Sequence, residues 1–116
     1  MVRAGQLEWF EDLPCSVTVC DKNYIILYMN GEATGANSGE GGKALIGKNL
    51  MDCHPPKARE KLKRVIASGR PNVYTTEKKG KKKMVYQCHW RRRGRVCGLV
   101  EFSFELPGNV PNFVRA

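Results

Sequence analysis

The chain has 116 residues, of which 41% are hydrophobic, and carries a formal net charge of +9. This length suits one domain with its own core, and no apolar run reaches the roughly 18–20 residues of a membrane span. The five cysteines are odd in number and lack the spacing of a zinc site, and the N-terminus lacks the apolar segment of a signal peptide. We therefore expect a cytoplasmic domain with reduced thiols and no membrane association.

Much of the positive charge lies in three clusters, at residues 57–64, 78–83 and 91–95. Such clusters can attract nucleic acid or an acidic partner. Charge runs are more often solvent-exposed helix faces and hairpin tips, and the chain has no nucleic-acid-binding motif. A basic nucleic-acid-binding accessory domain is therefore the least favoured of our hypotheses.

The first half of the chain predicts a short helix, a β-hairpin and further short helical segments. Apolar residues at near-helical spacing predict a helix over residues 6–13, which Pro14 ends. Alternating and β-branched residues predict strands at 16–20 and 24–29. The segments expected between and after these strands are a turn at 21–23, a short helix at 31–36 capped by Asn30, a flexible loop at 37–42 and a helical turn at 44–47.

The second half begins at His54, which is followed by Pro55 and Pro56. Proline is favoured in the first turn of a helix, so the two prolines predict the start of an amphipathic helix over residues 57–68. Gly69 is expected to close this helix. Three strands are predicted after it, at residues 72–77, 82–91 and 95–105.

This order of elements predicts an α+β fold, because helices gather in the middle and strands at both ends. We expect a five-stranded antiparallel sheet with short helices and one longer helix on one face, and a ligand-sized pocket between the layers. The expected organisation is an N-terminal helical cap at 1–13, the domain itself at 14–106 and a C-terminal tail at 107–116. The sequence contains no Ser/His/Asp set, no phosphate-binding loop and no paired-carboxylate motif. We therefore do not expect an enzyme.

Several short motifs, in this order and spacing, resemble those of PAS sensory domains. They are Leu13-Pro14, Asp21 at the end of a strand, Ile26-Leu27-Tyr28-Met29-Asn30, Leu45-Ile46-Gly47-Lys48 and Gly98-Leu99-Val100-Glu101. The resemblance implies a sensor of small molecules, redox state or light. It also implies a homodimer that signals to an effector such as a histidine kinase or a transcription regulator.

The segment Cys53-His54-Pro55-Pro56 is similar to a PAS subgroup that includes CO-responsive haem regulators. The resemblance implies b-type haem held by His54 and by Met84, which lies thirty residues later, for sensing CO, NO or redox state. A thioether ligand is easily displaced from haem iron by a gas. Strand alternation groups Met84 with Tyr86 and Trp90, so we expect these residues, with Cys53, around the cofactor.

Two alternatives remain open at this stage. His54 could cap the helix or bind the backbone, with Met84 as a core residue, in a cofactor-free module for dimerisation or protein interaction. The aromatic residues expected to fill the pocket of such a module are Trp90, Phe102, Phe104 and Tyr28. Cys53, at a helix N-terminus, is either a reactive thiol or a small buried hydrophobe.

Overall fold

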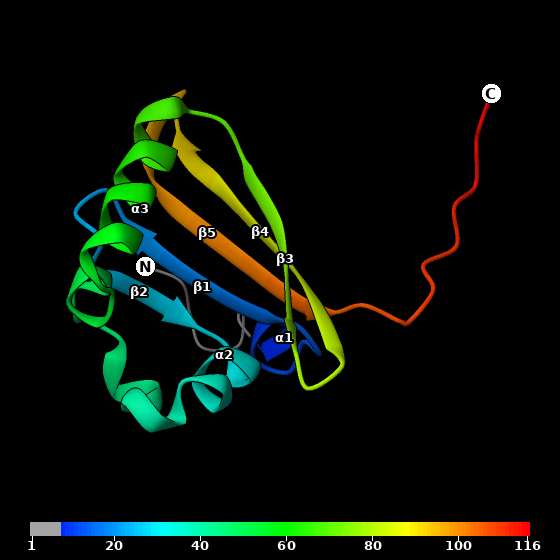
Figure 1. The fold of residues 1–116 in the computed structure, drawn as a ribbon. Helices are drawn as coiled ribbons and strands as arrows, with labels where there is room; N and C mark the ends of the chain where they lie inside the picture. The colour runs from blue at the N-terminus through cyan, green and yellow to red at the C-terminus, as the bar shows by residue number, and fades with distance from the viewer. Residues whose placement is uncertain (1–7) are drawn as a thin grey trace.

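The computed structural model describes residues 8–116 and, among these, every side chain except that of Cys53 (Figure 1). Its elements in chain order are α1 (Glu8–Glu11), β1 (Ser16–Asp21), β2 (Ile26–Met29), α2 (Gly31–Ala36), the 3-10 helices η2 (Ser38–Glu40), η3 (Gly42–Leu45) and η4 (Leu50–Cys53), α3 (Pro56–Ser68), β3 (Asn72–Lys78), β4 (Lys81–Arg92) and β5 (Arg95–Glu105). The strands form one antiparallel sheet in the order β2-β1-β5-β4-β3. The predicted α+β fold is therefore confirmed. No helix among residues 8–116 is long and apolar enough to cross a membrane.

The sheet has an inner face, covered by α3 and the short helical segments before it, and an opposite outer face (Figure 1). On the inner face, Glu101 of β5 pairs with Thr18 and with Gln87, which pairs in turn with Asn72. On the outer face, Phe102 of β5 pairs with Val17 and with Tyr86, which pairs in turn with Val73. Neighbouring residues of a strand point to opposite faces, so these two rows define the faces for the whole sheet.

Most of the core lies on the inner face, in two clusters that share Leu50 at their boundary. The first contains Cys20, Met51, Leu62, Val65 and Leu99, and the second contains Ile26, Met29, Ala33 and Leu45. Burying one large aliphatic side chain contributes roughly 1.5–3 kcal/mol, so the two clusters hold α3 and the short helices on the sheet.

The helix signals in the sequence are confirmed. Helix α3 has Pro55 at its N-cap and Pro56 in its first turn, and Gly69 closes it in the left-handed conformation at φ 67°. Helix α2 begins after Asn30, as predicted. Residues 1–7 lie outside the described part of the chain, so the predicted helix over residues 6–13 is described only as α1.

The helical turn predicted at 44–47 is found as η3 at Gly42–Leu45. Two further segments differ from the prediction because side chains and tight turns interrupt the regular pattern. Strand β2 begins at Ile26, since Tyr24 has a left-handed φ of 67° and the Asp21 carboxylate accepts bonds from the backbone N–H groups of Asn23 and Ile25. The predicted flexible loop at 37–42 contains η2.

Asn30 is fully buried and joins three parts of the chain. Its Oδ1 accepts hydrogen bonds from the backbone N–H of Val17 at 3.0 Å and of Ala33 at 3.1 Å, and its Nδ2 donates to the carbonyl of Cys15 at 2.8 Å. The predicted helix cap therefore also ties α2 to the start of β1.

We predict that Asn30→Ala lowers the free energy of unfolding by about 3 kcal/mol, because it removes a helix cap and leaves buried backbone groups without partners. Urea denaturation monitored by circular dichroism measures the change. Asn23→Ala, the same substitution in an exposed turn, is the control and should change stability by less than about 0.5 kcal/mol. Equal effects of the two substitutions would contradict this role for Asn30.

Candidate functional site

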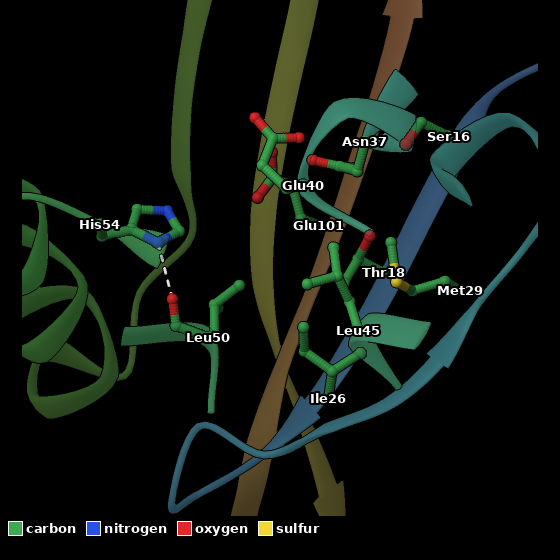
Figure 2. A pocket seen from close by; sticks show the side chains of 10 residues that line it. All are labelled: Ser16, Thr18, Ile26, Met29, Asn37, Glu40, Leu45, Leu50, His54 and Glu101. Atoms are coloured by element: carbon green, nitrogen blue, oxygen red, sulfur yellow. Dashed lines mark hydrogen bonds between the residues drawn. The ribbon is translucent and has the colours of Figure 1, made fainter. Parts of the chain in front are cut away.

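A cavity of about 310 Å³ lies between the inner face of the sheet and the segment from α2 to α3 (Figure 2). Its lining residues are Ser16, Thr18, Ile26, Met29, Asn37, Glu40, Leu45, Leu50, His54 and Glu101. Aliphatic side chains of β2, η3 and η4 form one part of the wall, and polar groups from β1, β5 and the short helices form the rest. This mixture of an apolar wall and a few polar groups is typical of small-molecule sites.

His54 is held at the cavity by the turn that leads into α3. Asn49 caps η4 by accepting the Met51 N–H at 2.8 Å, and the Nδ1 of His54 lies 2.7 Å from the carbonyl oxygen of Leu50 (Figure 2). A carbonyl only accepts, so Nδ1 carries a proton and donates to it. The alternative in which His54 binds the backbone is therefore confirmed, and the residue also lines the cavity.

Glu101 ends a chain of side-chain hydrogen bonds across three strands. Asn72 Nδ2 donates to Gln87 Oε1 at 2.9 Å, and Gln87 Nε2 donates to Glu101 Oε2 at 3.4 Å. Gln87 is only 6% exposed, so its amide cannot turn to water. Glu101 also borders two smaller cavities, of about 20 and 130 Å³, and is thus the charged residue at the centre of this region.

The surroundings of Glu101 favour its protonated form. Burial raises the pKa of the Glu101 carboxyl, and the hydrogen bond from Gln87 and the nearby His54 partly offset this rise. Among residues 8–116 the one ion pair joins Lys63 to Glu60 at 3.7 Å, so no described lysine or arginine neutralises Glu101. A carboxyl in such a place is a common mark of a functional site.

The predicted haem ligands are not brought together. Val85 and Gln87 are 5% and 6% exposed on the inner face, and Met84 and Tyr86, of the opposite parity in the same regular stretch of β4, therefore point to the outer face. The prediction that Met84, Tyr86 and Trp90 face the pocket is wrong. The physical reason is that β4 places His89 inward, where its Nε2 lies 2.8 Å from the Val65 carbonyl in α3.

Trp90 has a structural position on the outer face. It pairs with Gly98, and its indole nitrogen donates to the carbonyl of Cys20 at 2.9 Å. A Cβ at position 98 would collide with that carbonyl and with the indole nitrogen, so only glycine lets the indole reach β1.

The residues present do not fit a haem iron held between His54 and Met84, because the sheet separates the two side chains. The side chain of Cys53 lies outside the described part of the chain, so its predicted role stays a prediction. The aromatic residues expected to fill the pocket of a cofactor-free module do not line the cavity either. Phe104 and Tyr28 are 39% and 37% exposed.

Glu101, Thr18 and Ser16 are site residues that the sequence reasoning missed. The signal for Glu101 was available, because it is an acidic residue within the apolar run of β5 and shares its alternation with Leu99. Glu40 and Asn37 had no comparable signal, since they belong to a glycine-rich segment whose path the sequence pattern does not determine.

A family model described as the PAS fold matches residues 10–105 of the chain. No curated protein has a significant sequence match to this chain. Many solved structures have the same fold. Those from Streptococcus mutans and Vibrio cholerae are less than 25% identical to this chain, so their likeness shows the fold alone.

A C-terminal domain from Streptococcus mutans is 23% identical, with a TM-score of 0.72 over 90% of this chain and 85% of that one. A sensory box sensor histidine kinase from Vibrio cholerae is 15% identical, with a TM-score of 0.64 over 88% and 90% of the two chains. VqmA from the same organism, in complex with ligand and DNA, is 18% identical, with a TM-score of 0.67 over 91% of this chain and 52% of VqmA. This chain thus spans about half the length of VqmA.

We predict that Glu101→Gln stabilises the protein more at about pH 8 than at about pH 4. The raised pKa of Glu101 means that the folded state binds its proton more tightly than the unfolded chain, where the value is near 4.5. The free energy of unfolding therefore falls as pH rises from 4.5 through the pKa that Glu101 has in the folded state. Glu101→Gln cannot ionise, so the variant does not lose this stability. Melting temperatures at the two pH values measure the difference.

Glu105→Gln, at the exposed end of the same strand, is the matched control. It should shift the melting temperature by the same amount at both pH values. A pH-independent shift for Glu101→Gln would show that burial of this carboxyl has no effect on stability.

Proposed function

The chain belongs to the PAS fold family, and from this premise we propose that it is a sensory domain that binds a small molecule in the 310 Å³ cavity. The observation that carries the proposal is the convergence of polar groups from separate elements on one space with an apolar wall. Its role is regulatory rather than catalytic, as is general for this family.

The cavity can couple to the rest of the domain through the segment 47–50. This segment bonds along β2, with the N–H of Gly47 to the Ile26 carbonyl at 2.8 Å, the N–H of Ile26 to the Lys48 carbonyl at 2.9 Å and the N–H of Leu50 to the Tyr24 carbonyl at 2.7 Å. Leu50, the first residue of η4, and His54, which follows its last residue, both line the cavity. A ligand that binds one arrangement of this segment better shifts the population toward it.

The partners we propose follow from the relatives in fold. One is a sensor histidine kinase, and VqmA is described with ligand and DNA and also as a dimer. We propose that this domain passes its signal to an effector of either kind. Its described cysteines (Cys15, Cys20, Cys88 and Cys97) are all free, which suits a reducing compartment such as the cytoplasm.

We also propose that the outer face of the sheet binds a second copy of the chain. Val73, Tyr86 and Phe104 of this face are 51%, 37% and 39% exposed. Two copies with a net charge of +9 each repel one another, so contact through this apolar surface is the arrangement that costs least. A stable interface requires about 1,200–2,000 Å² in total.

We predict that Thr18→Phe abolishes ligand binding, because the ring fills the cavity from the middle of β1. A thermal-shift screen of small metabolites identifies ligands that raise the melting temperature of the unmodified protein. Thr75→Phe, on the outer face of β3, is the matched control and should keep the same shifts. Equal shifts with both variants would place binding elsewhere.

We predict that Phe104→Lys converts the dimer to a monomer, because it buries a charge in an apolar interface. Light scattering after size-exclusion chromatography measures the mass. Phe113→Lys, in the C-terminal tail at 76% exposure, should leave the dimer intact. A monomeric unmodified protein at about 0.1 mM, where a dimer with a Kd of about 1 μM would be almost fully formed, would overturn the dimer proposal.

A further inference from the structure

We propose that the cavity selects small organic cations, namely protonated amines with a short aliphatic body. This inference rests on the proposed ligand-binding function and names the chemical class of the ligand. Two carboxylates, Glu40 and Glu101, line the cavity, and its lining contains no lysine or arginine. The cavity is therefore acidic in a protein whose net charge is +9.

Among residues 8–116 no lysine or arginine forms an ion pair with Glu101, and the basic group that lowers the pKa of its carboxyl is His54. Lys61, on the wall of the neighbouring cavity that Glu101 also borders, has its ammonium group over the ring of Tyr74, 4.7 Å from the centroid. Gln87 donates to the carboxylate at 3.4 Å, which is long for a charge-assisted bond. Burial raises the pKa of Glu101, because it disfavours the charged carboxylate. A bound cation would stabilise that carboxylate and would not have to displace a lysine or arginine from an existing ion pair.

The other polar groups of the cavity can serve as acceptors. The hydroxyl groups of Ser16 and Thr18 line the same cavity and can also accept. An ammonium group has three donors and no acceptor, so this set matches it, whereas an anion would lie beside the carboxylates of Glu101 and of the exposed Glu40.

The size of the cavity and its apolar wall indicate how large and how apolar the uncharged part of the ligand is. Its volume of about 310 Å³ is at the low end of the roughly 300–1,000 Å³ found for ligand sites. Ile26, Met29 and Leu45 form a wall for a short aliphatic body. The basic surface does not prevent cation binding, because charges farther than about 8 Å are screened at physiological ionic strength.

Three probes with the same branched five-carbon skeleton and different charge test this inference: isopentylamine, isopentanol and isovalerate. Isothermal titration calorimetry and thermal shift measure their binding to the full chain at neutral pH. We expect the amine to bind at least ten-fold more tightly than the alcohol, and isovalerate not to bind.

Two variants then locate the charge recognition. Glu101→Gln keeps the shape of the side chain and should weaken amine binding at least ten-fold without changing binding of the alcohol. Glu105→Gln should leave both affinities unchanged. Circular dichroism of each variant verifies that it is folded.

The outcomes separate this inference from the proposed function. Equal binding of the amine and the alcohol, or tighter binding of isovalerate, would overturn cation selectivity and still support a ligand cavity. Amine binding that Glu101→Gln does not weaken would also overturn it. No binding of any probe would overturn the inference, and the metabolite screen with Thr18→Phe would then decide separately whether the cavity binds ligands.

Discussion

A buried polar side chain must find hydrogen-bond partners inside the protein, and this constraint acts at two places in the described chain. The buried polar residues of the described chain are Asn30 and Gln87. Asn30 satisfies backbone groups of β1 and α2, and so fixes where the helical segment leaves the sheet. Gln87 links Asn72 to Glu101, and so fixes the carboxyl that borders the cavity. The need to satisfy buried polar groups thus positions both the start of α2 and the carboxyl group of Glu101.

The cavity exists because short helices cover the inner face less completely than one long helix would. Between α2 and α3 the chain forms 3-10 turns that bond to the edge of β2. These turns carry aliphatic residues inward and bring His54 back toward the sheet. The packed cluster around Leu62 and Leu99 lies beside the cavity, so a rigid region adjoins a hollow one, as a domain that responds to a ligand requires.

Local signals made much of the fold predictable, because caps and alternation act within a few residues. Helix α2 and strand β5 have the predicted bounds. Alternation predicted the wrong face of β4, because the more apolar of its two residue sets, which contains Met84, Tyr86 and Trp90, faces outward. A shift of one residue moves a whole set to the other face, and here the bond from His89 to α3 decides it. The spacing between His54 and Met84 could not reveal that the sheet lies between them, whereas alternation alone would have indicated Glu101.

The bonds of His89 have a mechanical consequence. Its Nε2 lies 2.8 and 3.2 Å from the carbonyls of Val65 and Ile66, in the last turns of α3. One end of this helix is therefore attached to β4, while the other end follows His54 at the cavity. Thirteen residues make α3 about 20 Å long. Val65 lies nine residues, about 14 Å, from Pro56, so a displacement of about 1 Å at the cavity end would tilt α3 by about 4° around this attachment.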